Sequence, residues 1–343
     1  MAYSCGSIIG LYQKPKYRVI SSVLGEDFSP DGFDIYIDMN TTVTTLSSAS
    51  KFMNGIPFSD NVESDLVSNI LGMVKHWKDF SRKYESSRIF LLWNDFEMRP
   101  LPEQEILKSY LQHYQNTYRQ DRYKQFVYYW TEAMKKVEVV LKYIPQSYVI
   151  KTNFVDSLIV PAILSDASRT KLIVSGSQLF TSYTFCPNTR VMYSRFSRHG
   201  NAHLSDPMMI CQSISKIELD VMDIFCKNQV FYNLLQAIIG DLDRGIMGMS
   251  SFGITNFAND LLRAVEKHKI PQDPKSIESV LPCINQNYHE YLKQVYPLIH
   301  IESHRQFIPP SIEEKTKSLL IDLLDIDGLA QFSVDGMNLL ELL

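Results

Sequence analysis

Three short apolar runs, separated by longer stretches of mixed composition, constrain the fold of this chain most strongly. The runs cover 33–39, 88–94 and 171–176, and we predict that each forms a buried strand. Between the first two, residues 62–84 show helical spacing, with these side chains on one face: Val62, Leu66, Ile70, Val74 and Trp77. Strands that alternate with helices indicate an α/β fold, with a central, mostly parallel sheet and helices on both sides.

Composition sets the class of protein. A chain of 343 residues, 45% of them hydrophobic and 21% charged, can bury a sizeable core and is typical of a soluble globular protein. Its five cysteines are far apart and form no disulfide framework, which favours a reducing compartment. No secretory signal is evident, and the longest uncharged apolar runs fall well short of the ~20 residues that span a bilayer. We therefore expect a soluble, non-secreted protein without membrane contact.

Polar side chains stand where the predicted strands end. Asp38 ends the first run, Asn94 the second, and Ser175 lies at the end of the third. In an open α/β sheet, groups at the carboxyl ends of parallel strands converge on one crevice. Asp156 and Asp241 begin helical segments that we expect to face the same place. Carboxylates gathered there are the ligands that a two-metal nuclease needs, because each Mg²⁺ takes oxygen ligands.

A basic, aromatic segment follows the second strand. Residues 105–143 are predicted to be helical, and their seven basic and four acidic side chains alternate with tyrosines. Tyrosines beside a positive groove suit single-stranded nucleic acid, because bases stack on aromatic rings. The candidate contacts are Lys108, Arg119, Arg122 and Lys124. An amphipathic helix with packed tyrosines and solvated charges explains the same pattern, and this alternative stays open.

Closely spaced glycines mark the stretch from Gly240 to Ala258. Gly248 and Gly253 are interpreted as a turn, and Thr255 as the N-cap of a following helix whose apolar face carries Phe257, Leu261 and Val265. The backbone of such a turn and the start of the helix can hold a phosphate group. Taken alone, such glycines more often mark an ordinary loop than a DNA contact.

The order of these elements resembles the flap endonuclease and phage 5′-nuclease superfamily, including its T-even-phage ribonuclease H branch, from about residue 33 to 267. The resemblance implies a PIN-like α/β domain over 33–235, with a helical arch at about 104–143. It also implies a C-terminal helical subdomain over 236–343 that contains a helix-turn-helix glycine hairpin and an apolar tail. Residues 1–32 are then an N-terminal extension.

The acids of that family map unevenly onto this chain. Three positions keep their acid: Asp38, Asp156 and Asp241. Six positions have lost it: Asn94, Asn153, Val155, Ser177, Leu179 and Arg244. Neutral groups do not balance the charge of two Mg²⁺ ions, and Arg244 adds a cation where the family expects a metal. We therefore expect no catalytic residues and no cofactor, although one weakly bound Mg²⁺ on Asp38 and Asp241 remains an alternative.

The resemblance thus implies a catalytically inactive relative of phage 5′-nucleases. It would serve as a DNA-binding or assembly module in a replication, transcription or virion complex, with single-stranded or branched DNA and phage proteins as partners. Its location would be the host cytoplasm or the virion. The net charge of −4 argues against strong nonspecific DNA binding but leaves room for a local basic face. The alternative is an active, metal-dependent, structure-specific 5′-nuclease, of flap endonuclease or ribonuclease H type.

Overall fold

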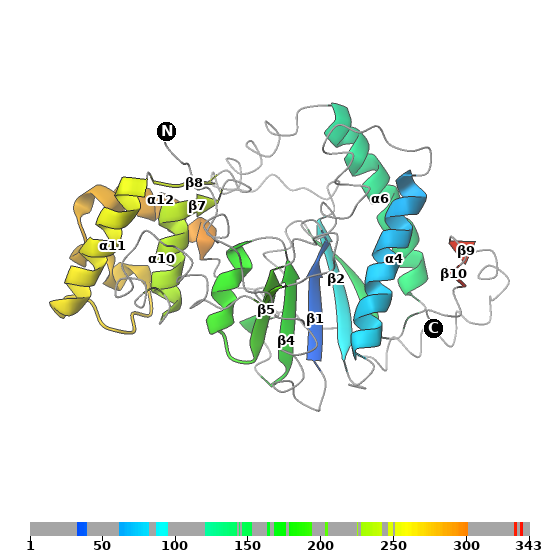
Figure 1. The fold of residues 1–343 in the computed structure, drawn as a ribbon, viewed down its shortest axis with the longest axis horizontal. Coiled ribbons are helices and arrows are strands. Elements are labelled where there is room, and N and C mark those ends of the chain that lie inside the picture. The colour runs from blue at the N-terminus through cyan, green and yellow to red at the C-terminus, as the bar shows by residue number, and fades with distance from the viewer. Residues whose placement is uncertain are drawn as a thin grey trace.

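A computed structural model of the chain describes residues 33–39, 62–81, 87–94, 121–142, 144, 146–152, 163–164, 168–175, 178–193, 203–204, 225, 228–241, 246–249, 251–300, 333–334 and 337–338. These residues form a central sheet with helices on its two sides and a group of helices from the C-terminal third of the chain (Figure 1). Within this part of the chain, no helix is both long and apolar enough to cross a membrane.

The central sheet has six strands in the order β3-β2-β1-β4-β5-β6. The strands are β1 (Phe33–Asp38), β2 (Arg88–Asn94), β3 (Ser147–Thr152), β4 (Thr170–Ser175), β5 (Thr189–Tyr193) and β6 (His203–Leu204). Strands β1 to β5 run parallel, and β6 pairs antiparallel with β5. The strand order reverses between β1 and β4, so the topological switch point, where α/β sheets bind their ligands, lies between these two strands.

The predicted α/β class, with its central, mostly parallel sheet, is confirmed. The apolar runs 33–39, 88–94 and 171–176 correspond to β1, β2 and β4, which are neighbours in the sheet. Strands β3, β5 and β6 were not predicted. They lie outside these central strands and complete the sheet on both sides.

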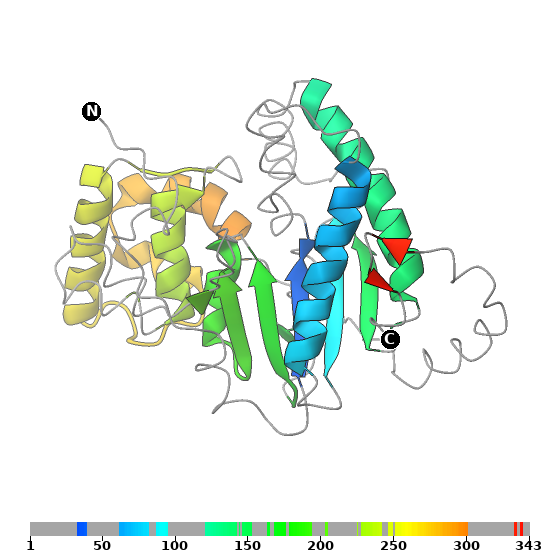
Figure 2. The ribbon, with the colours of Figure 1, turned by 45° about the vertical axis from the view of Figure 1, so that its right-hand side comes forward.

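One face of the sheet is covered by α4 (Val62–Ser81) and α6 (Asp121–Leu141), which pack against each other (Figures 1 and 2). All three tryptophans of the chain lie in this layer and are almost fully buried: Trp77, Trp93 and Trp130. Because side chains alternate along a strand, Phe33, Ile35 and Ile37 reach this face. The helix predicted over 62–84 is thereby confirmed over 62–81.

A second core begins on the opposite face and continues into the C-terminal helices. Tyr36, Phe90 and Tyr148 form a stack across three strands, with ring centroids 4.9 and 5.1 Å apart. The 3₁₀ helix η2 (Gln178–Phe185) lies between β5 and α10 (Gln229–Ile239) (Figure 1). The stacked rings, η2 and α10 belong to one continuous cluster of buried side chains.

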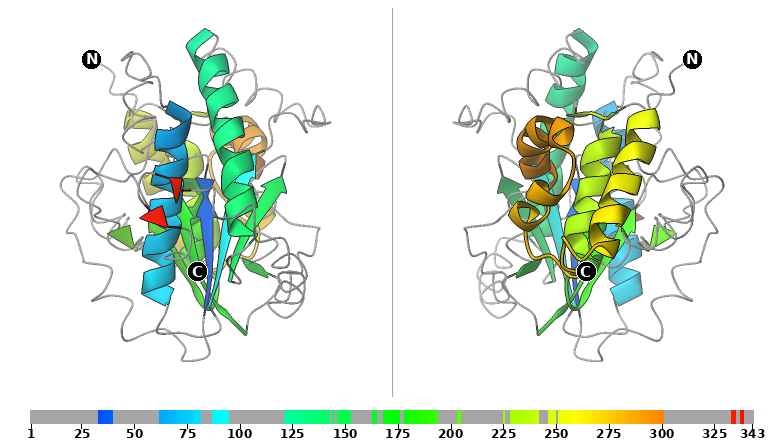
Figure 3. Two further views of the ribbon diagram at one scale, coloured as in Figure 1. Left: turned by 90° about the vertical axis from the view of Figure 1, so that its right-hand side faces the viewer. Right: turned by 90° about the vertical axis from the view of Figure 1, so that its left-hand side faces the viewer.

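Helices α11 (Ser251–Glu266) and α12 (His289–Ile299) complete this second layer (Figure 3). Short 3₁₀ segments join them: η4 (Ile277–Ser279), η5 (Leu281–Cys283) and η6 (Gln286–Tyr288). The domain boundary that we predict after residue 235 falls inside α10. The division at that residue therefore remains a prediction, since α10 shares its buried side chains with both parts.

The predicted apolar tail is described only as a small antiparallel hairpin of β9 (Ser333–Val334) and β10 (Met337–Asn338). Strand β9 lies beside α4 (Figures 2 and 3). The N-terminal extension over 1–32 is outside the described residues.

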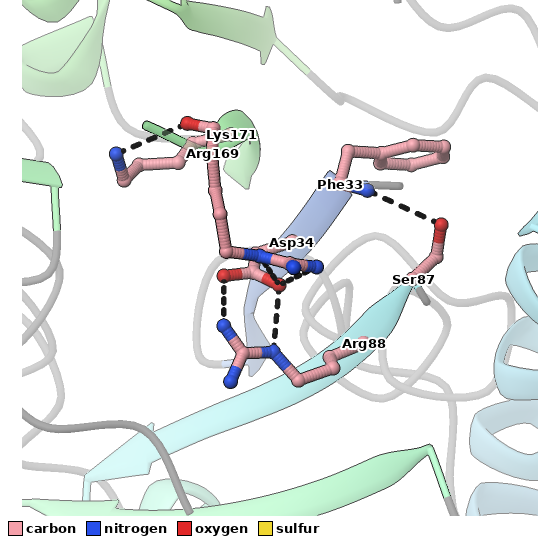
Figure 4. A network of polar contacts seen from close by, with 6 residues as sticks. All are labelled: Phe33, Asp34, Ser87, Arg88, Arg169 and Lys171. Atoms are coloured by element: carbon pink, nitrogen blue, oxygen red, sulfur yellow. Dashed lines mark hydrogen bonds and ion pairs between the residues drawn. The ribbon is translucent and has the colours of Figure 1, made fainter. Parts of the chain in front are cut away.

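A buried ion cluster ties the amino ends of the central strands together (Figure 4). The Asp34 carboxylate, 1% exposed, accepts hydrogen bonds from Arg88 Nε (2.8 Å) and Nη2 (2.6 Å), and from Arg169 Nε (3.2 Å). Burial by itself lowers the pKa of Arg88, but the hydrogen bonds and negative charge of Asp34 outweigh it and raise the pKa. This cluster lies at the end of the sheet opposite the carboxyl ends of the strands and has a structural role.

Candidate functional site

Asp38 and Ser175 meet at the topological switch point. They are the last residues of β1 and β4, and the pairing of Ile37 with Val174 places them side by side. Both are buried, at 3% and 0% exposure. Ser175 Oγ donates a hydrogen bond of 2.7 Å to Asp38 Oδ2. The carboxylate that the sequence marks as a metal ligand is therefore already bonded to a hydroxyl from the neighbouring strand.

Asn94 lies at the same edge of the sheet. It ends β2 two positions beyond Leu92, the residue paired with Asp38, and it pairs with Thr152 of β3. The structure brings its backbone to the strand edge where the sequence places it. Position 94 supplies a neutral amide in place of an acid, so β2 adds no negative charge to this edge.

The described residues contain only part of the predicted metal site. Among them, no three His, Cys, Asp or Glu side chains lie close enough together to hold a metal. At the switch point they provide one carboxylate, Asp38, and the hydroxyl of Ser175 that is bonded to it. Two Mg²⁺ ions clamping a phosphoryl group need several carboxylates, because oxygen ligands must balance four positive charges.

Of the other positions that keep or have lost an acid, two lie in described elements and five lie outside the described residues. Asp241 lies in β7 (Gly240–Asp241) and Leu179 in η2, both known here by backbone only. Leu179 thus belongs to a 3₁₀ helix that begins three positions after the end of β4. The other positions fall outside the described residues: Asn153, Val155, Asp156, Ser177 and Arg244.

The predicted helical arch is described from Asp121 onward as α6. The amino-terminal part of this helix extends beyond the carboxyl ends of the strands (Figures 1 and 2). Arg122 and Lys124 lie in its first turn, while Lys108 and Arg119 are outside the described residues. We therefore find the carboxyl half of the arch to be a single long helix.

The described half of α6 is amphipathic. Trp130, Met134 and Val137 are buried against the sheet layer. On the outer side, Lys135 Nζ lies 2.8 Å from Glu132 Oε1, and Lys136 forms an ion pair with Glu63 of α4. These pairs match the alternative of solvated charges on an amphipathic helix. Tyr128 does not match it, because 62% of this large side chain is exposed.

The glycine stretch forms a short antiparallel hairpin between α10 and α11. Its strands are β7 and β8 (Ile246–Met247), with Gly240 paired to Met247. Gly240 begins the hairpin at φ 84°, a left-handed conformation that glycine adopts without steric cost. The helix–hairpin–helix arrangement is thus present, with a two-stranded ribbon in place of a simple turn.

Gly248 is required by close packing. A Cβ atom at this position would overlap the carbonyl group of Ile239, the last residue of α10. The next residue, Met249, donates its N–H to Ile238 O at 2.7 Å. These two contacts press the end of the hairpin directly onto the carboxyl end of α10.

Two details of the predicted hairpin were wrong. Helix α11 begins at Ser251, so Gly253 lies in its first turn rather than in the hairpin, and Thr255 is inside the helix rather than its N-cap. The serines at 250 and 251 are good helix-starting residues and allow the helix to begin earlier. The predicted apolar face is present, since Phe257 and Leu261 are buried and Val265 packs against the same core.

Sequence reasoning did not identify Ser175 as the hydrogen-bond partner of Asp38. The signal was available, because both residues end apolar runs that are adjacent in a parallel sheet. Tyr291 of α12 was also missed. Its phenol donates a hydrogen bond of 2.6 Å to Ala237 O in the last turn of α10, and nothing in the local pattern of α12 points to that contact.

Comparisons with known proteins give matches among solved structures only. No family model matches the chain, and no curated protein matches it. The bacteriophage T5 flap endonuclease, in a pseudo-enzyme–product complex with DNA and metal ions, is 14% identical with a TM-score of 0.44. That match covers 90% of this chain and 98% of the other.

Two further structures give similar values. One is a T5 protein co-crystallised with metal ions, at 13% identity and a TM-score of 0.44, covering 86% of this chain and 99% of that one. The other is the T5 5′-exonuclease with zinc, at 15% identity and a TM-score of 0.44, covering 84% of this chain and 98% of that one. These matches come from the superfamily that the sequence resembles.

Proposed function

We propose that this chain is a non-catalytic relative of the phage 5′-nucleases that binds nucleic acid as a module of a larger phage complex. The observation that carries the proposal is Asn94 at the end of β2, the strand paired with β1, where Asp38 is held. The superfamily places a second metal-binding acid at that strand end, and this chain supplies a neutral amide.

Charge supports the loss of catalysis. Hydrolysis by two metal ions requires ligands that hold both ions about 4 Å apart against their mutual repulsion. Here β2 ends in an amide, and Ser177 and Leu179 stand where the superfamily has two acids after β4. The carboxylates kept at 38, 156 and 241 are too few for two ions, and the cation of Arg244 opposes metal binding.

Two features support binding of nucleic acid. The arch segment has an excess of basic residues, and its described part presents the largely exposed ring of Tyr128 on the outside of α6. The glycine hairpin is anchored to α10 through Gly248 and Met249, which gives its backbone a fixed place next to the start of α11. A helix start and neighbouring backbone N–H groups form a suitable contact for a single phosphate.

Binding is tested by titrating labelled flap, nicked and single-stranded DNA at several salt concentrations. We expect affinity to fall as salt rises, and Arg119→Ala/Arg122→Ala to weaken binding and flatten the salt dependence. The matched control is Lys267→Ala/Lys293→Ala, which removes one basic residue just after α11 and one within α12. No binding by the wild type would refute the nucleic-acid role and leave a purely structural assembly subunit. Equal loss in both variants would refute binding through the arch.

Catalysis is tested separately with the same substrates in Mg²⁺ or Mn²⁺. We expect no cleavage by the wild type above the level of an Asp38→Ala/Asp241→Ala variant. Cleavage that the double variant abolishes would establish the alternative, a nuclease that works with one weakly held metal ion.

A further inference from the structure

The glycine hairpin packs on the carboxyl end of α10. The backbone carbonyls in the last turn of that helix need hydrogen-bond donors. The last four backbone carbonyls of a helix receive no hydrogen bond from a later N–H of the same helix, so other groups must donate to them. Here Gln236 O accepts from Gly240 N, and Ile238 O accepts from Met249 N at 2.7 Å. The hairpin itself therefore supplies two of the partners.

Tyr291 of α12 supplies a third. Its hydroxyl donates to Ala237 O at 2.6 Å, across 54 positions in sequence. The side chain is half-buried, and burial raises the pKa of Tyr291 to about 12. The phenol consequently keeps its proton at neutral pH and remains a donor. Ala237 is fully buried, so no bulk water is at hand to replace this bond.

The fourth carbonyl, that of Ile239, lies against Gly248. The carbonyls of residues 236 to 239 thus contact, in turn, the hairpin, α12, the hairpin and the hairpin again. A shift of the last turn of α10 would change all of these contacts together, because consecutive peptide groups of a helix move as a unit.

We propose that Tyr291 is a positioning residue for the glycine hairpin: by holding Ala237 O, it fixes the last turn of α10 and with it Gly248 and Met249. The inference concerns the geometry of the hairpin, and its effect on affinity rests on the proposed function. Tyr291 itself lies on α12, outside the hairpin, and acts only through α10.

Hydrogen exchange of the Met249 amide is the direct test. In Tyr291→Phe, we expect exchange of this amide to be about fivefold faster, the factor that corresponds to one net hydrogen bond. Two controls separate positioning from general destabilisation. Tyr288→Phe removes a hydroxyl from η6 and keeps the aromatic ring, which packs edge-on against Phe257. Leu292→Val trims the buried neighbour of Tyr291 and keeps the phenol in place.

The inference holds if only Tyr291→Phe accelerates exchange at Met249, when all variants are compared at equal global stability. It is overturned if exchange at Met249 does not change, or if Leu292→Val accelerates it equally. DNA affinity, measured on the same proteins, should drop about three- to fivefold in Tyr291→Phe alone. Failure of the wild type to bind DNA would overturn the proposed function, while the exchange data would still decide the role of Tyr291.

Discussion

At the scale of single residues, the acid retained at the end of β1 accepts a hydrogen bond from the neighbouring strand β4. Asp38 and Ser175 are both buried, and the distance between Oγ and Oδ2 is 2.7 Å. A hydrogen bond to a charged group contributes more than one between neutral groups, roughly 1.5–3 kcal/mol. A buried carboxylate that loses a donor is left poorly solvated, so this bond matters for folding whatever its place in function.

Ser175→Ala should therefore lower the free energy of unfolding by about 1.5–3 kcal/mol, because it removes a donor from the buried Asp38 carboxylate. Urea unfolding at neutral pH measures this loss. Ser279→Ala, at an exposed 3₁₀ position, is the control and should change stability by less than about 0.5 kcal/mol. Equal stability of both variants would show that Asp38 does not depend on Ser175.

Glycine to alanine should have opposite effects at two positions. Gly248→Ala places a methyl group against the Ile239 carbonyl and should cost about 1–3 kcal/mol, as overpacking does. Gly72→Ala, within α4, meets no atom within 4 Å and should stabilise the protein by up to about 1 kcal/mol through helix propensity. Thermal or urea unfolding gives both values, and a Gly248→Ala protein at least as stable as the wild type would contradict the close contact at Gly248.

Alkaline pH should weaken the anchor of α10. The pKa of Tyr291 is raised by burial to about 12, so its contribution to stability is complete below the ordinary tyrosine pKa of about 10 and is lost as pH rises toward 12. Stability measured between pH 9 and 11.5 should fall more steeply for the wild type than for Tyr291→Phe. Parallel curves would mean that this phenol is not protected in the folded state.

At the scale of elements, α6 divides into an inner face that is packed and an outer face that is free to meet a partner. On the inner face, Trp130 and Val137 are buried against the sheet, whereas the side chain of Tyr128 is exposed. Lys135 and Lys136 each form an ion pair with a glutamate, which weakens the attraction of these two lysines for phosphates. The exposed ring is consequently the best described contact for a base on this helix.

Tyr128→Ala should weaken binding of single-stranded DNA by about 1–3 kcal/mol, the range measured for stacking of a base on an aromatic ring. Stability should hardly change, because the side chain is 62% exposed. Val139→Ala, at an exposed apolar residue of the same helix, is the control for binding. Loss of affinity in both variants, or in neither, would exclude stacking on Tyr128.

At the scale of the whole molecule, the sheet is shared by two cores. The core beneath α4 and α6 contains all three tryptophans, and the other core runs from the strands through η2 to α10, α11 and α12. Both cores use alternate side chains of the same strands, so damage to one should be felt in the other.

Phe257→Ala tests that coupling. The buried ring lies in α11, and its loss should cost about 3–5 kcal/mol. We expect tryptophan fluorescence, which reports on the opposite core, to show a lower unfolding midpoint in this variant. A fluorescence transition that stays in place while helical signal is lost earlier would instead support separate domains with a boundary near residue 235.

The success of sequence-based prediction varied with the environment of each element. Strands β1, β2 and β4 were predicted because they are central and apolar on both faces. Strands β3 and β5, with sequences SYVIKT and TRVMY, mix polar and apolar residues and gave no comparable signal. Helix α10 was missed although Asn233 and Gln236 form a polar stripe along it, and these polar residues are buried with the rest of Val230–Ile239.

The sequence by itself determined the α/β class, the central strands and the presence of an acid, an amide and a hydroxyl at their ends, because these follow from local hydrophobic patterns. Only the tertiary structure decided that Ser175 bonds to Asp38, 137 positions away, and that Tyr291 and Gly248 meet the last turn of α10. Such contacts depend on strand register and helix packing. These are set by the whole buried core, and no short stretch of sequence encodes them.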